Sequence, residues 1–169
     1  SGYPVEVIIA TDLHYISPEL VEEGPLFNNM YLNGDGKQMN YIGEITDAFI
    51  DEVIDLQPHG LVLSGDLTFN GEKKSHEDLV EKLDKVVNAG IRVFVTPGNH
   101  DVNNYYSVGF EEESAYEVDR VTADEFREMY GPFGFDEAIY EDQHSLSYVT
   151  PLSEDLWFVM LDTNRYYNQ

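Results

Sequence analysis

Three short apolar runs rich in β-branched residues alternate with two segments of helical periodicity, and this alternation constrains the fold more than any other feature. The runs cover residues 5–11, 60–66 and 91–97, and their length and composition predict β-strands. Apolar residues recur at helical spacing over 40–56 and 75–90, which predicts two helices. This order favours parallel strands joined by right-handed crossovers, so we expect an α/β domain.

The rest of the chain gives weaker signals. We expect a short helix over 123–130, and we expect the runs 145–150 and 156–161 to pair as an antiparallel hairpin. Asn-Gly-Asp-Gly at 33–36 resembles the start of a calcium loop, but the next two residues, a lysine and a glutamine, lack the required ligand and glycine, so we reject this interpretation. With 169 residues, 42% of them apolar, the chain is long enough for one domain with a hydrophobic core.

The charge balance restricts the partners. The chain has 33 acidic and 9 basic residues, a formal net charge of −24, which repels nucleic-acid backbones and anionic membranes. Most of these carboxylates are expected to form a solvated acidic surface, and a few could bind cations. No run approaches the roughly 18 apolar residues of a membrane span. Cysteine is absent, which excludes disulfides and thiolate metal ligands.

A polar cluster follows each of the three predicted strands. Residues 11–14 are Thr-Asp-Leu-His, 64–71 are Ser-Gly-Asp-Leu-Thr-Phe-Asn-Gly, and 96–101 are Thr-Pro-Gly-Asn-His-Asp. Because the C-terminal ends of parallel strands share one edge, where ligand sites of open α/β sheets form, we expect the clusters to meet. The side chains that would converge are Asp12, His14, Asp66, Asn99, His100 and Asp101.

These side chains offer oxygen and imidazole ligands, a set that suits manganese, iron, zinc or cobalt. Asp12 and His14 are two apart on an extended chain and project to the same side. Asp66, on the middle cluster, is the natural candidate to bridge two ions. Gly65 and Gly98 permit sharp turns close to a bound ion. One such cluster alone would mean little, but three at successive strand ends favour a metal site.

The clusters resemble the motifs of the calcineurin-like metallophosphoesterases. That family's pattern has D-x-H, then G-D, then G-N-H-[D/E], each at a strand end, and the chain carries them as Asp12-Leu13-His14, Gly65-Asp66 and Gly98-Asn99-His100-Asp101. The resemblance covers about residues 5–101, and 157–164 resembles a later strand of the family. It implies a four-layer αββα sandwich, of which this chain would supply the N-terminal βαβαβ sheet half plus a hairpin.

The resemblance also implies a centre of two divalent metal ions. Asp12 and His14 would hold the first ion. Asp66 would bridge both ions, and Asn99 would bind the second. Two such ions clamp a phosphate and neutralise the charge that develops in an in-line displacement.

By the same resemblance, His100 would not bind metal. It would protonate the leaving group or stabilise charge on the phosphoryl oxygens, and Asp101 would orient its imidazole. The substrate would be a small phosphomonoester, phosphodiester or nucleotide derivative. A nucleic acid is disfavoured, because the acidic chain lacks a basic track for a phosphate backbone.

The chain departs from the family pattern in its histidines. The family has a later lone histidine and a G-H-x-H cluster, whereas no histidine follows His144. His59 lies at the wrong end of a predicted strand. His76 follows Ser75, predicted to open a helix in a capping box with Asp78, and is expected on the surface. None of the three is a convincing substitute, and His144 merely opens the hairpin.

The absent histidines suggest that residues 1–169 are the N-terminal part of a single metallophosphoesterase domain whose C-terminal part is missing. The uncovered apolar surface would then make the chain self-associate or bind its other half. Two alternatives stay open: a non-catalytic binding module with at most one weakly held ion, and an acidic domain that binds cations over many carboxylates. The acidity, the lack of cysteine and the Ser1-Gly2 start slightly favour an exported bacterial protein over a cytoplasmic one.

Overall fold

A parallel three-stranded sheet lies at the centre of the computed structural model, which describes residues 4–22, 24–32 and 39–165. The rejected calcium loop at 33–36 lies outside the described residues. The strands are β1 (Val7–Ala10), β2 (Gly60–Ser64) and β3 (Arg92–Thr96), in the order β1-β2-β3. Both pairings are parallel, so the predicted parallel sheet is confirmed.

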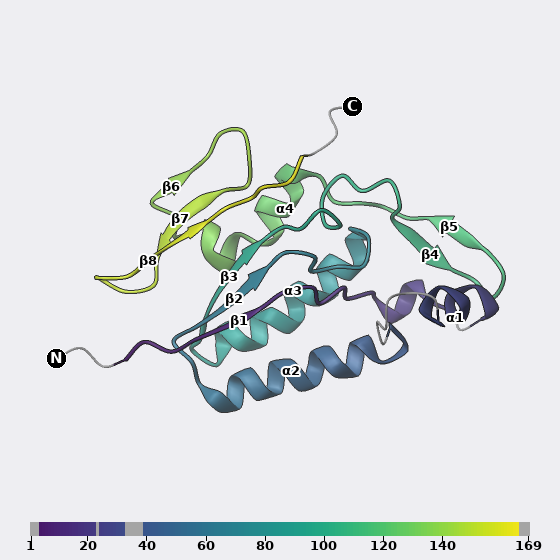
Figure 1. Ribbon diagram of the computed structural model, residues 1–169, viewed down its shortest axis with the longest axis horizontal. Helices are drawn as coiled ribbons and strands as arrows, with labels where there is room; N and C mark the ends of the chain where they lie inside the picture. The colour runs from purple at the N-terminus through teal and green to yellow at the C-terminus, as the bar shows by residue number, and fades with distance from the viewer. Residues whose placement is uncertain (1–3, 23, 33–38, 166–169) are drawn as a thin grey trace.

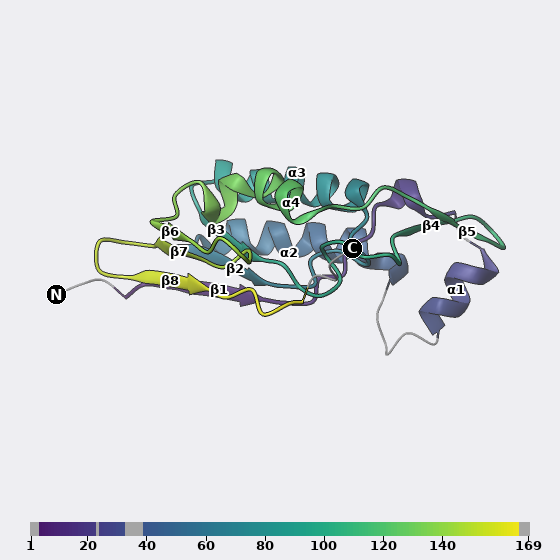
Figure 2. The same cartoon turned by 90° about the horizontal axis from the view of Figure 1, so that it is seen from above.

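The helices α2 (Ile42–Leu56), α3 (Lys73–Asn88) and α4 (Ala123–Met129) cover one face of this sheet (Figures 1 and 2). The apolar stripe of α3 faces the core, and Leu79 and Leu83 are fully buried. The start of α3 corrects the predicted cap. The helix begins two residues before Ser75, whose hydroxyl instead accepts a hydrogen bond from the Ser17 N–H.

An antiparallel sheet continues the fold beyond β3. It contains β6 (Tyr140–Glu141), β7 (Tyr148–Pro151) and β8 (Trp157–Met160), and β7 and β8 form the predicted hairpin. Two aromatic residues of this antiparallel sheet contact β3. The Phe158 ring lies 5.0 Å from the Phe94 ring. The buried Tyr148 hydroxyl donates to the Val95 carbonyl at 2.7 Å and accepts from the Val95 N–H at 3.2 Å.

Tyr148→Phe should therefore destabilise the fold by about 1–3 kcal/mol, because it leaves a buried N–H and a buried carbonyl of Val95 without partners. The measurement is the free energy of unfolding in urea. Tyr140→Phe is the matched control, since Tyr140 is exposed on β6, and it should leave the midpoint unchanged. Equal stability of the two variants would show that Tyr148 does not attach the sheets.

The sequence did not predict several short elements. They lie between the main strands and have too few residues to show a periodic pattern: η1 (Pro18–Leu20), α1 (Pro25–Leu32), η2 (Met39–Tyr41), β4 (Val108–Phe110), β5 (Ala115–Glu117) and η3 (Gly131–Phe135). A second apolar cluster holds α1, η2 and β4 together. Its buried members are Ile16, Phe27, Met39 and Phe110, which come from four separate segments.

The face of the strands opposite the helices carries no further layer within the described part of the chain (Figure 2). Ile9 on β1 is 69% exposed, and Trp157 and Val159 on β8 are 59% and 63% exposed. The four-layer arrangement and the missing C-terminal half thus stay predictions, as does self-association through this face. Light scattering that shows a stable monomer with no second fragment would count against them.

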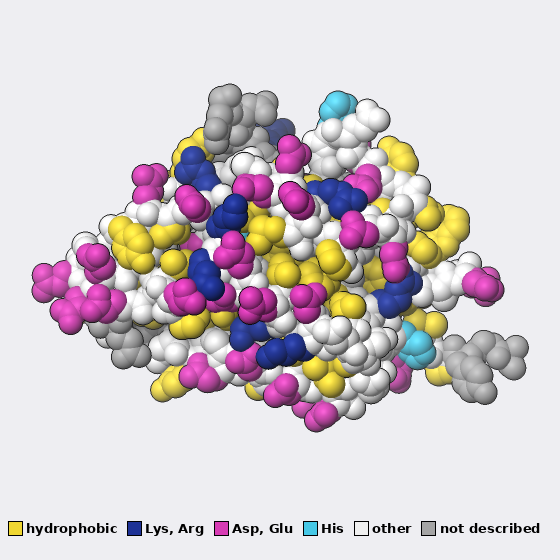
Figure 3. All heavy atoms as spheres, turned by 180° about the vertical axis from the view of Figure 1, so that it is seen from behind, with side chains coloured by type: hydrophobic (Ala, Val, Ile, Leu, Met, Phe, Trp, Pro, Cys, Tyr) yellow, Lys and Arg dark blue, Asp and Glu magenta, His cyan; other side chains and the backbone are white. Residues whose placement is uncertain are grey.

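The helix-covered face carries many charged side chains, with apolar side chains visible between them (Figure 3). Acidic side chains are spread across it, with lysine and arginine side chains between them. Ion pairs such as Lys82 with Asp47 and Lys74 with Asp78 lie on α2 and α3. This arrangement fits the solvated acidic surface expected from the composition. Among the described residues, no helix has both the length and the apolar character that a membrane crossing requires.

Candidate metal centre

The segments that follow β1 and β2 run side by side and bring the first two polar clusters together. The Asp12 N–H donates to the Gly65 carbonyl at 3.1 Å, and the His14 N–H donates to the Asp66 carbonyl at 2.9 Å. The pairing of β1 with β2 therefore continues past the ends of the strands. Its consequence is that Asp12 and His14 lie beside Asp66.

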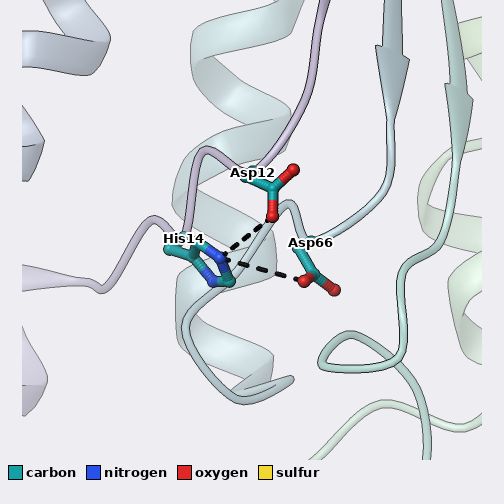
Figure 4. A group of neighbouring side chains, drawn as sticks. All are labelled: Asp12, His14 and Asp66. Carbon is teal, nitrogen blue, oxygen red and sulfur yellow. Dashed lines mark ion pairs between the residues drawn. The ribbon is translucent and has the colours of Figure 1, made fainter. Parts of the chain in front are cut away.

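The three side chains point toward one another (Figure 4). His14 Nε2 lies 3.4 Å from Asp12 Oδ1 and 3.8 Å from Asp66 Oδ2. One potential ligand atom from each residue lies within 4.8 Å of the other two, so a single cation could contact all three. His14 is buried and Asp12 is exposed. Two carboxylates and an imidazole fit a divalent transition metal, and the predicted meeting of these residues is confirmed.

The backbone is unusual at the same three positions. Asp12, His14 and Asp66 have φ values of 57°, 47° and 49°, and only Gln57 and Asn103 share a positive φ among the other described non-glycine residues. Asp and His tolerate this left-handed region better than most residues. It still costs on the order of 1 kcal/mol or more per residue, and such strain concentrates at functional sites. The strain thus marks the same three residues as the side-chain geometry.

The third polar cluster holds Asp66 in place from the β3 side. The His100 N–H donates to Asp66 Oδ1 at 3.2 Å. Gly98 lies so close that a Cβ atom there would be 2.1 Å from both the backbone N and the Oδ1 of Asp66. Only glycine fits at this position unless both the backbone and the carboxylate of Asp66 move.

Gly98→Ala should therefore displace Asp66 and weaken Mn²⁺ binding by about 10- to 100-fold, the usual effect of disturbing a group that supports a metal ligand. Titration calorimetry measures the affinity. Gly43→Ala is the matched control, because a Cβ at Gly43 meets nothing within 4 Å. Unchanged affinity in Gly98→Ala would mean that the position of Asp66 does not matter for the metal.

The imidazole of His100 lies next to this group. Its ring centre is 5.2 Å from that of His14, with the rings at 88°. His100 Nδ1 lies 2.8 Å from the Phe69 carbonyl oxygen and 2.9 Å from Asn70 Oδ1. Because both partners are acceptors, Nδ1 carries the hydrogen. Nε2 is then the nitrogen that can exchange a proton with a ligand.

Asn99, the fourth predicted metal ligand, is exposed. Together with His100 it lines a cavity of about 350 Å³. No hydrogen bond of its side chain is found among the described residues. Its assignment to a second metal ion stays a prediction.

Asp101 does not have the position that the resemblance implied. Its buried carboxylate accepts hydrogen bonds from the N–H groups of Leu67 (3.0 Å), Thr68 (2.8 Å) and Gly98 (2.7 Å), and from the Thr68 hydroxyl (2.8 Å). None of its described hydrogen bonds reaches the His100 imidazole, which Phe69 and Asn70 hold instead. Asp101 fastens the segment after β3 to the segment after β2.

His76 is buried, so its predicted place on the surface is wrong. Nε2 lies 2.9 Å from the Asp101 carbonyl oxygen, and Nδ1 lies 2.7 Å from the Tyr130 hydroxyl. Burial lowers the pKa of His76 and raises that of Tyr130, so both are neutral and support the Asp101 backbone. The sequence carries a signal for this: His76 precedes Leu79 and Leu83 at helical spacing on the buried stripe.

The two remaining histidines do not join the group of potential ligands. His59 precedes β2, and its Nδ1 accepts a hydrogen bond from the Glu6 N–H at 3.1 Å. His144 is exposed in the turn between β6 and β7. This agrees with the expectation that neither substitutes for the histidines that the family pattern contains.

One of the comparisons with known proteins finds a match to this chain. A family model described as calcineurin-like phosphoesterase matches residues 5–165, nearly the whole chain. The match includes all three polar clusters and β8. A search of curated proteins finds no match.

Proposed function

The chain belongs to the calcineurin-like phosphoesterases, and we propose that it hydrolyses a small phosphate ester at a centre of two divalent metal ions. Membership in this family indicates metal-dependent phosphoester hydrolysis. The observation that carries the proposal is the group of Asp12, His14 and Asp66, whose ligand atoms lie within 4.8 Å of one another. The His100 imidazole beside them supplies a proton-transferring group at the same place.

The proposed ligands come from all three clusters. Asp12 and His14 would hold one ion, Asp66 would be shared by both ions, and Asn99 would contribute to the second. When bound, such ions (manganese, iron, zinc or cobalt) neutralise phosphoryl charge and activate a water molecule. The strained backbone at Asp12, His14 and Asp66 supports this assignment, since it holds the three side chains in a converging geometry.

His100 has the proton-transfer role in this proposal. Its Nδ1–H is fixed by the Phe69 carbonyl and by Asn70. Its Nε2 has no hydrogen-bond partner among the described residues. When both ring nitrogens carry a hydrogen, Nε2–H gives its proton to the leaving oxygen, which returns the ring to the Nδ1–H form, or donates a hydrogen bond to a phosphoryl oxygen. The substrate is a small ester rather than a nucleic acid, because the net charge of −24 opposes a polyanion.

Hydrolysis of bis-p-nitrophenyl phosphate with added Mn²⁺ tests the proposal. Chelation should abolish activity, and Mn²⁺ should restore it. His100→Asn retains a side-chain N–H near the position of Nδ1 and removes Nε2, so kcat should fall by about 100-fold or more while Mn²⁺ still binds. His144→Asn, an exposed histidine outside the site, is the control and should retain full activity.

The alternatives predict different results. A non-catalytic module would bind Mn²⁺ through Asp12 without hydrolysing any ester. An acidic domain that binds cations over many carboxylates would bind Mn²⁺ equally well after Asp12→Ala. Either result would replace the enzymatic proposal.

A further inference from the structure

The cavity beside His100 has a lining that differs from the rest of this acidic chain. It measures about 350 Å³, and its walls carry asparagine amides, the rings of Tyr105 and Tyr106, and Arg165, with no carboxylate among the described residues that line it. The segment between β3 and β4 contributes most of the lining residues. We propose that this cavity binds the alcohol part of the phosphate ester, and that this part is a nucleoside. The inference rests on the proposed function for its link to catalysis.

Hydrogen bonds hold the inner wall of the cavity against His100. Asn104 Nδ2 donates to the His100 carbonyl at 3.0 Å, and Asn104 Oδ1 accepts from the Tyr106 N–H at 2.9 Å. The Ser107 hydroxyl donates to the Asn70 carbonyl at 2.6 Å. The wall is therefore formed before a ligand arrives, which lowers the entropy cost of binding.

Asn103 offers its side chain to a ligand. Its backbone is fixed, because its N–H donates to the Val121 carbonyl at 2.8 Å and its φ is 51°. No described hydrogen bond uses its amide group. An amide can donate and accept at once, which matches the adjoining donor and acceptor on the edge of a nucleobase such as adenine.

The two tyrosines supply aromatic surface. Tyr106 is 77% exposed, and Tyr105 is 49% exposed with the Arg120 guanidinium 4.2 Å from its ring centre. Nucleobases stack on such rings whatever their sequence identity. The described lining residues include no carboxylate, which disfavours a cationic alcohol such as choline. The cavity volume of about 350 Å³ falls at the small end of the range for ligand sites.

The test is binding of adenosine to metal-free protein, followed by amide chemical shifts in NMR. Adenosine carries no phosphate, so the metal centre cannot capture it. We expect shifts confined to residue 70 and to residues 99–107 and 164–165, which line the cavity. Asn103→Gly keeps the left-handed backbone and removes the amide, and Tyr106→Leu removes the ring. The double variant should bind adenosine about tenfold more weakly or worse.

Each outcome decides the assignment. Shifts in the named segments that weaken in the double variant support it. Shifts elsewhere, equal binding by the double variant, or equal shifts with glucose would overturn it. Hydrolysis of bis-p-nitrophenyl phosphate by the unmodified protein tests the proposed function separately. A protein that hydrolyses this ester but does not bind adenosine would therefore lose only the nucleoside assignment.

Discussion

Asp66→Asn should lower metal-dependent hydrolysis of bis-p-nitrophenyl phosphate by about 1,000-fold, because the centre loses roughly 4 kcal/mol of charge stabilisation when its shared carboxylate becomes neutral. Asp66 is the side chain on which the three clusters converge. Its Oδ2 lies 3.8 Å from His14 Nε2, and its Oδ1 accepts from the His100 N–H at 3.2 Å. Asparagine tolerates the left-handed φ of 49° at this position and retains an oxygen acceptor.

The expected change is therefore in metal affinity, with little change in the fold. Titration calorimetry measures the affinity for Mn²⁺. The midpoint of thermal unfolding of the metal-free protein measures the stability of the fold separately. Asp51→Asn, which removes an exposed carboxylate on α2, should bind Mn²⁺ like the unmodified protein. If both variants bind Mn²⁺ equally and tightly, the ion lies elsewhere and the proposed centre is wrong.

The sequence predicted the part of the site that follows from the direction of the strands. Parallel strands place their C-terminal ends at one edge, so Asp12, His14 and Asp66 had to approach one another once the three apolar runs were assigned. Helix periodicity likewise predicted α2 and α3 to within a few residues. Both arguments need only local pattern and chain direction.

The sequence could not predict contacts that depend on the detailed path of the loops. Asp101 pairs with N–H groups of Leu67 and Thr68, more than 30 positions earlier in the chain, as the separations of 34 and 33 residues show. Nothing in the composition of either segment indicates that partnership. The motif suggested the neighbouring His100 as the partner of Asp101, whereas the turn at Gly98 directs the carboxylate into the protein. The prediction for His76 was wrong because it depended on a helix start at Ser75, whereas α3 begins at Lys73 and His76 lies on the buried stripe.

Asp101→Asn should lower the free energy of unfolding by about 1–3 kcal/mol, the usual cost of leaving a buried donor without its acceptor. Each oxygen of the Asp101 carboxylate accepts two hydrogen bonds. Oδ2 accepts from the N–H groups of Leu67 and Gly98, and Oδ1 accepts from the N–H and the hydroxyl of Thr68. Either orientation of an amide would set its NH₂ against at least one backbone N–H, because Oδ2 faces two N–H groups and Oδ1 faces the Thr68 N–H. Urea unfolding of the metal-free protein measures the change.

This result separates two roles for Asp101. If its carboxylate holds the segments after β2 and β3 together, Asp101→Asn lowers stability and Mn²⁺ affinity together, because Gly98 and Asp66 move with the loop. If it acted only by orienting His100, unfolding would change by less than about 0.5 kcal/mol and only kcat would fall. Asp55→Asn, an exposed position on α2, provides the baseline. The hydrogen bonds of Asp101 favour the first outcome, since each joins it to the backbone or side chain of the two segments that form the metal centre.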